Sequence, residues 1–379
     1  MRIIFNEIKK VFNVKMIVLI MFISLIIYNL FLSFGLKYFP NGRPEGDYYK
    51  ISVQMLKDYG TTMDKKEFLN FKELYNTQIE QATKYLQARP EFVSAGITTY
   101  KKYQDIAMSP NGKLSKLHDK VVFDDNVDIF WELQVREGLI NEYEGIGNTK
   151  YLGLNKNQLE RYHETIKNGS ITSILPEFVF RNYNDLIKNV AMLIVLSIII
   201  MISPIFIKDS KNKVNYLQYT SKIGRKIFKI KLITALISSF IIISLHLICF
   251  FILYSHNKVE MFFSSSINSI FNYNTSWYNI TFIHYIVIAV VGVYVLGFAA
   301  TLIVTFLSRI APNYIMLIGV QVPITFAILN ISSKYLLNNL TSTTFSKYCQ
   351  PLAYSIIVCI GLVLISIRWK KEKVVDIIN

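Results

Sequence analysis

Long apolar stretches alternate with charged segments along this chain of 379 residues, and the alternation predicts its architecture. A helix of about 20 residues crosses the ~30 Å hydrocarbon layer of a bilayer, and each stretch approaches or exceeds that length. We predict six spans, at 16–36, 189–207, 232–254, 281–307, 314–329 and 351–369. The predicted fold class is an all-α polytopic membrane protein with a mostly helical domain outside the bilayer.

The first stretch, 16–36, is predicted to remain as a membrane span. A secretory signal peptide would have a shorter apolar core and a cleavage site of small residues. Neither feature is present in this stretch.

The positive charge is concentrated beside the spans, which predicts their orientation. Segments 1–15, 208–231 and 368–379, together with Arg309, hold 17 of the 41 Lys and Arg residues. The acids among them are Glu7, Asp209, Glu372 and Asp376. Short basic segments stay on the cytoplasmic side of a membrane, so both termini, including the tail 370–379, are predicted to be cytoplasmic.

The partner that this charge predicts is anionic membrane lipid and not nucleic acid. The large loop 37–188 has 21 basic and 21 acidic residues, so it is neutral. The basic residues are therefore not gathered on one soluble module, as a nucleic-acid-binding domain would require.

The loop 37–188 is long and polar enough to form a separate extracellular domain. Apolar residues at helical spacing predict helices at 64–89, 124–143 and 155–166. Asp64 followed by Glu67 is the pattern of a capping box. The loop contains no cysteine, so it has no disulfide framework. The segments 255–280 and 330–350 are predicted to be shorter outer loops.

The N-terminal segment 1–15 carries an apolar stripe at Ile4, Ile8 and Phe12, with lysines off the stripe. This pattern is typical of a short helix that lies on the cytoplasmic leaflet. A plain basic flank to the first span is an equally good interpretation.

Catalytic and cofactor motifs are missing from the sequence. No phosphate-binding GxxxxGK[ST] motif occurs, and the nearest glycine cluster, Gly145 and Gly147, is interpreted as a turn. His246 and His284 stand alone in their spans, without the spacing of a metal site, and Cys249, Cys349 and Cys359 do not supply it. We predict a non-catalytic chain that binds no metal and no cofactor.

The sequence argues against an ion-coupled transporter, because such transporters usually need a carboxylate within the membrane and no acidic residue lies within the predicted spans. Pro204 is expected to kink or end the second span. Gln321 and Pro323 lie in the fifth span, where an unwound segment is possible and a packed kink is the commoner explanation.

The segment 208–231 is the most basic on the predicted cytoplasmic side. Ser221 could cap a short helix, and Gly224 could permit a tight bend. Its candidate site residues are Thr220, Ser221, Lys222, Gly224, Arg225, Lys226 and Lys229. A basic flank that only orients the spans is the alternative interpretation.

With this segment and six spans around a large loop, the chain resembles permease subunits of ABC exporters of the ABCA-like class. That class has an amphipathic N-terminal helix, a large outer domain between spans one and two, and a cytoplasmic coupling helix between spans two and three. The resemblance implies that the candidate residues above dock on a separate ATPase subunit, which would bind ATP and Mg²⁺. It also implies a dimer, with an identical or a second permease.

The function expected from the sequence is ATP-driven export of an amphipathic or hydrophobic cargo, such as a peptide, drug or lipid. The alternative is a membrane sensor or immunity protein whose outer domain binds a ligand without transport. An intramembrane enzyme is a weaker alternative, because no catalytic pair is present. The abundance of Asn, Lys, Ile and Tyr is typical of an AT-rich bacterial genome. Since the outer domain has no cysteine, we expect the plasma membrane of a Gram-positive bacterium.

Overall fold

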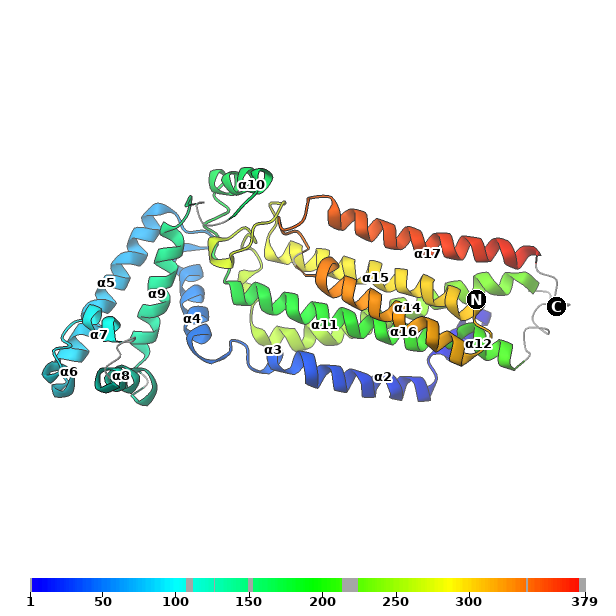
Figure 1. The fold of residues 1–379 in the computed structure, drawn as a ribbon, viewed down its shortest axis with the longest axis horizontal. Coiled ribbons are helices and arrows are strands. Elements are labelled where there is room, and N and C mark those ends of the chain that lie inside the picture. The colour runs from blue at the N-terminus through cyan, green and yellow to red at the C-terminus, as the bar shows by residue number, and fades with distance from the viewer. Residues whose placement is uncertain are drawn as a thin grey trace. The chain divides into compact units, whose positions relative to one another are not determined.

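The computed structural model describes residues 2–106, 112–125, 127–148, 153–212, 224–338 and 340–374. Within these ranges every regular element is a helix, and backbone pairing is limited to isolated bridges (Figure 1). The chain divides into two compact units. The span unit comprises Met1–Lys37, Arg181–Lys258 and His284–Asn379, and the loop unit comprises Tyr38–Phe180 and Val259–Ile283.

Six helical segments of the described residues are long and apolar enough to cross a membrane, which confirms the predicted polytopic all-α fold. They are Val14–Lys37, Glu177–Lys211, Ile227–Asn257, Phe282–Ile310, Tyr314–Leu336 and Cys349–Lys373. The first consists of α2 (Val14–Ile27), the π-helical turn η1 (Tyr28–Leu32) and α3 (Ser33–Lys37). The second consists of α11 (Glu177–Ile202) and α12 (Pro204–Lys211). The others are formed by α14 (Ile227–Tyr254), α15 (Phe282–Ile310), α16 (Tyr314–Ile331) with η7 (Ser332–Leu336), and α17 (Cys349–Val374).

The span helices extend beyond the apolar stretches that predicted them. The helix of span two begins at Glu177, before the predicted start of the span at residue 189, and a carboxylate in the first turn suits the positive end of the helix dipole. Pro204 interrupts this span as expected and becomes the first residue of α12. The helix of span three begins at Ile227, so the last basic residues of segment 208–231 belong to α14 itself.

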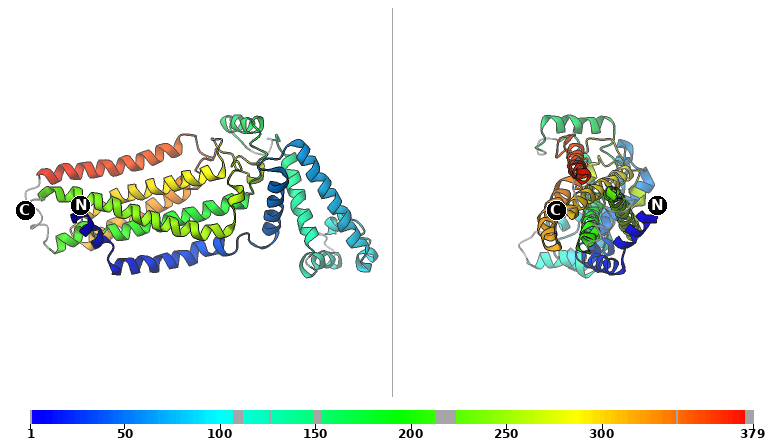
Figure 2. Two further views of the ribbon diagram at one scale, coloured as in Figure 1. Left: turned by 180° about the vertical axis from the view of Figure 1, so that it is seen from behind. Right: turned by 90° about the vertical axis from the view of Figure 1, so that its right-hand side faces the viewer.

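Helices α11 and α15 form the centre of the span unit. In their most apolar windows 72% and 56% of the residues are buried, against 12–33% for the other four spans. Thr301 on α15 donates a hydrogen bond to Ser239 on α14 over 2.6 Å, a polar contact of the kind that joins helices within membranes. The outer spans therefore surround a central pair and leave most of their apolar surface uncovered. Figure 2 shows the helices of this unit running side by side.

Span one is fastened to the other spans through the backbone at its second half. The amides of Asn182 and Asn257 donate to the carbonyl oxygen of Gly35 over 3.0 and 3.1 Å, and Asn189 donates to Phe31 O over 3.3 Å. A Cβ atom at Gly35 would lie 3.0 Å from Asn182 Nδ2, so the close approach depends on this glycine.

The loop unit is built from the helices between the first two spans. They are α4 (Gly42–Tyr59), α5 (Lys65–Gln87), α6 (Pro90–Ser94), α7 (Tyr100–Ile106), α8 (Gly112–Asp119), the π-helical turn η2 (Lys120–Asp124), α9 (Asp128–Glu144) and α10 (Lys156–Lys167). Helices α5, α9 and α10 confirm the three predicted ones. The predicted capping box is present, because Asp64 and Glu67 each accept a backbone hydrogen bond from the other.

Two apolar clusters stabilise the loop unit, and both are built on the packing of α5 against α9. One gathers around Phe71 and Leu139, the other around Leu86 and Phe130. Each includes buried aromatic rings, whose large apolar area makes the main contribution to such a core. The loop unit therefore has hydrophobic cores of its own.

The segment predicted as the outer loop 255–280 contributes to this unit through residues 259–283. Ile270 donates a backbone hydrogen bond to Ile171 O over 2.8 Å. The buried guanidinium of Arg161 on α10 donates to Ser276 O over 2.7 Å and to Asn279 Oδ1 over 2.6 Å. The two loops thus fold as one structure.

Glu142 on α9 makes the stability of the loop unit depend on pH. Burial raises the pKa of its carboxyl group, although Tyr273 and Tyr48 donate hydrogen bonds to it and oppose the shift. Because the pKa is raised in the folded state, its stabilising contribution is present below the ordinary value of about 4.3 and is lost as pH rises through the folded value. We expect Glu142→Gln to remove this part of the pH dependence.

The measurement is hydrogen exchange of the α9 backbone in the full chain between about pH 4 and 8, corrected for intrinsic exchange rates. Glu144→Gln, on the exposed part of the same helix, is the control variant. An unchanged pH profile in Glu142→Gln would contradict the assignment.

Candidate functional site

A buried lysine joins three helices at one end of the span unit. Lys231 lies in the second turn of α14 and is 1% exposed. Its Nζ is 2.6 Å from Asp209 Oδ2 on α12 and 3.6 Å from Glu7 Oε2 on α1 (Arg2–Val11). It also donates to the carbonyl oxygen of Ile205 on α12. We call this end of the span unit, where α12 lies in Figure 1, the basic end.

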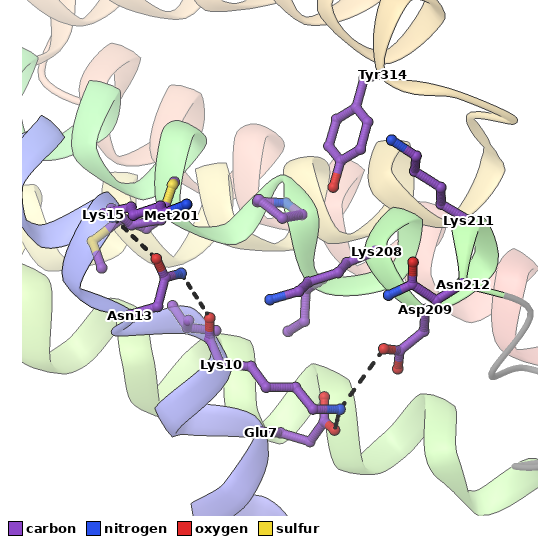
Figure 3. Close-up of a pocket in the computed structure, with 14 residues that line it drawn as sticks. Glu7, Lys10, Asn13, Lys15, Met201, Lys208, Asp209, Lys211, Asn212 and Tyr314 are labelled. Carbon is purple, nitrogen blue, oxygen red and sulfur yellow. Dashed lines mark hydrogen bonds and ion pairs between the residues drawn. The ribbon is translucent and has the colours of Figure 1, made fainter.

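The N-terminal helix is present as predicted, but its buried face is turned to the protein. Helix α1 packs against α14 and α12, and Glu7 and Val11 are its buried residues. Lys10 on the next turn pairs with Glu7 and lies 3.7 Å from Asp209 (Figure 3). Burial alone would lower the pKa of Lys10, but the hydrogen bond and charge of Glu7, with Asp209 adding to them, raise it, so the lysine stays charged.

A second charge cluster lies on α15 and α17 at the same end. Arg309 makes two hydrogen bonds to the Glu372 carboxylate, at 2.7 and 3.0 Å, and Arg368 pairs with the same group at 2.7 Å. Glu372 is 2% exposed, so its buried carboxylate is neutralised by the guanidinium groups of Arg309 and Arg368.

Phe206 on α12 lies between the two clusters. Its ring centroid is 5.0 Å from Lys231 Nζ and 5.7 Å from the Arg309 guanidinium carbon, within the range of cation–π attraction. The ring also stacks on Phe228, which in turn stacks on Trp369 of α17. The two clusters are therefore in contact through aromatic side chains.

Together these side chains connect α1, α12, α14, α15 and α17 in one set of contacts, which we call the basic-end network. Its members are Glu7, Lys10, Phe206, Asp209, Lys231, Arg309, Arg368 and Glu372. Three of the four acids on the predicted cytoplasmic side belong to it. They are used inside the protein, and the exposed lysines described at that end, such as Lys15, Lys208 and Lys226, can face solvent, lipid or a partner.

The predicted coupling residues are only partly covered by the structure. Thr220, Ser221 and Lys222 lie outside the described residues. Gly224 has a φ of +48°, so the expected tight bend is present, and it begins the short 3₁₀ helix η3 (Gly224–Lys226) that contains the backbone of Arg225.

Lys226 and Lys229 follow at the start of α14, and both are exposed. Lys229 Nζ lies 4.8 Å from the Trp369 ring centroid. The described part of segment 208–231 thus has four exposed lysines, Lys208 and Lys211 in α12 and Lys226 and Lys229 around the start of α14.

A cavity of about 380 Å³ opens beside the network (Figure 3). Its lining includes four lysines, Lys10, Lys15, Lys208 and Lys211, and the hydroxyl-bearing Tyr314. The carboxylates of Glu7 and Asp209 also line it, but they are paired with Lys10 and Lys231, so the net charge of the lining is positive. Ammonium groups cannot ligate a metal ion, and the described residues contain no group of His, Cys, Asp and Glu that could hold one. The cavity suits an anion.

Two polar residues within the spans, His246 and Gln321, make hydrogen bonds to neighbouring helices. His246 Nδ1 lies 2.8 Å from Ile242 O, so this nitrogen carries the proton, and Nε2 accepts from Ser197 Oγ at 3.3 Å. Gln321 Oε1 accepts from Ser203 Oγ at 3.0 Å, and α16 continues through Pro323 without unwinding. These groups join helices, and His284 is exposed.

Sequence reasoning missed the basic-end network, although its signal was present. Asp209 and Glu372 are isolated acids within strongly basic segments beside spans, and Glu7 interrupts the basic N-terminal helix. An acid that lowers the positive charge of such a segment is a candidate partner for a buried cation. Counting net charge per segment does not reveal that pairing.

Comparisons with models of known families, with curated proteins and with solved structures gave no match to this chain.

Replacing Lys231 should destabilise the span unit strongly. Lys231→Met leaves the carboxylates of Glu7 and Asp209 buried with less compensation, and losing one partner of a buried pair costs about 3–5 kcal/mol. Lys226→Met, an exposed position nearby, should change the unfolding free energy by less than about 0.5 kcal/mol. Unfolding of the full chain in detergent measures both.

Adding Asp209→Asn to Lys231→Met should restore part of the loss, since it removes a carboxylate left without its cation. Equal stability of Lys231→Met and the unmodified chain would show that the lysine is not a structural charge.

Proposed function

We propose that this chain is the membrane permease subunit of an ATP-driven exporter. It acts as a dimer with separate ATPase subunits and moves an amphipathic or hydrophobic cargo, such as a peptide, drug or lipid, out of a bacterial cell across the plasma membrane. The observation that carries the proposal is the burial of Lys231 between Glu7 and Asp209, because it joins both ends of the basic segment to the spans.

The network gives this segment a means of moving the spans. Asp209 lies near its start and Lys231 at its end, and the two are 2.6 Å apart. A partner that displaces the exposed residues between them would displace α12 and α14 together. Through Phe206 and Arg309 the displacement would reach α15 and α17.

The energy source lies on another chain in this proposal. The sequence has no GxxxxGK[ST] motif, and a phosphate-cradling loop is what a P-loop ATPase needs. The exposed ammonium groups of Lys226 and Lys229, with the charge of Arg225, make the segment complementary to an acidic surface. An ATPase subunit with an acidic groove is the partner this chemistry fits.

The test is purification of the tagged full chain from the membranes of its own host, followed by mass spectrometry and assay of Mg-ATP hydrolysis. We expect an ATPase subunit in stoichiometric amount and two permease chains per complex. Lys226→Glu with Lys229→Glu should lower the recovered ATPase about tenfold, because the charge complementarity is reversed.

Lys101→Glu with Lys116→Glu, the same charge change on exposed lysines of the loop unit, is the matched control and should leave recovery unchanged. A chain that purifies as an intact dimer without any ATPase would contradict the proposal and favour the membrane sensor.

A further inference from the structure

An apolar groove of about 620 Å³ runs between span one and spans two and three. Its lining comes from α2 and α3 on one wall and from α11 and α14 on the other, and includes Ile17, Leu25, Leu193, Cys249 and Phe250. Only 17% of the apolar window of span one is buried, so most of this helix is not packed against protein. A groove of this composition at membrane depth is suited to hydrocarbon.

The groove extends along span one from Ile17 to Leu36, past the hydrogen bonds that fasten the second half of the span. The hydrogen bonds from Asn182, Asn257 and Asn189 reach only the second half of the span, at Phe31 and Gly35. The first half, which begins at Val14, has no such interhelical hydrogen bond among the described residues. The span is thus held by side-chain hydrogen bonds in its second half only.

At the basic end the groove adjoins the cationic cavity. Met201 of α11 lines both, and Val11 and Phe12 are consecutive residues on their two walls. Lys15, Lys208 and Lys211 are exposed at the cavity, and no described carboxylate pairs with them. Figure 3 shows Lys15, Lys208, Lys211 and Tyr314 among the side chains that line the cavity.

We propose that these two cavities together are a specific binding site for an anionic phospholipid. The phosphate lies against Lys15, Lys208 and Lys211, with the Tyr314 hydroxyl as a further donor, and an acyl chain fills the groove along α2. Positive charge at headgroup depth, continuous with an apolar groove at hydrocarbon depth, matches a molecule that has an anionic head and an apolar tail. The proposal does not rest on the partner ATPase.

The test measures lipid binding to the purified full chain in detergent by native mass spectrometry, with dioleoyl phosphatidylglycerol and dioleoyl phosphatidylcholine as probes. We expect one phosphatidylglycerol per chain to bind at least fivefold more tightly than phosphatidylcholine. Lys15→Gln, Lys208→Gln and Lys211→Gln combined should weaken phosphatidylglycerol binding about tenfold, since juxtamembrane lysines each attract anionic lipid.

The charge control is Lys226→Gln, Lys370→Gln and Lys371→Gln, which removes three exposed lysines that do not line the site. Binding of the acyl chain in the groove is tested with Cys249→Trp, which fills the groove. Its control is Cys359→Trp, at an exposed cysteine on another span. Only the first of each pair should lose binding.

Equal binding of the two lipids, or equal effects of each variant and its control, would leave only annular lipid and overturn the proposal. Millimolar glycerol phosphate separates the two sources of the anion. Displacement of the lipid by this soluble headgroup, together with unchanged binding in Cys249→Trp, would identify a free-phosphate site and contradict the lipid.

Discussion

The burial of one ammonium group, that of Lys231, organises the basic end of the membrane-spanning unit. A charge removed from water costs several kcal/mol unless partners surround it, and here two carboxylates and a backbone carbonyl do so. The partners come from α1 and α12, so neither helix can move away from α14 without exposing an unpaired buried charge. This constraint holds α1, the short N-terminal helix, and α12, the last part of span two, against α14, so that the three helices move together.

The same constraint separates two kinds of charge at this end. The acids are used to neutralise cations inside the protein, as Glu372 does for Arg309 and Arg368. Among the exposed lysines that the structure describes at this end, Lys226 and Lys229 lie near Gly224, and Lys15, Lys208 and Lys211 line the cavity beside α2. One group suits an acidic protein surface and the other an anionic headgroup, so the proposed partner and the proposed lipid would not compete for the same residues.

Much of the fold follows from the sequence, because span length and helical periodicity are local properties. The six spans, α5 with its capping box at Asp64, and the bend at Gly224 are of this kind. The contact of Glu7 with Lys231 could not be predicted from local properties. The two residues lie far apart in the chain, and charge counts do not show which charged groups are buried. The union of 259–283 with the large loop depends on backbone pairs such as Ile171 with Ile270, which have no side-chain pattern.

The most direct measurement of the coupling is hydrogen exchange of the full chain in lipid nanodiscs, comparing Glu7→Gln with the unmodified protein. If the network acts as one body, removing one carboxylate charge on α1 will raise the exchange of α12 and of the first turns of α14 as well as that of α1. An increase confined to residues 2–11 would contradict it, because α1 would then be a separate helix that only rests on the spans.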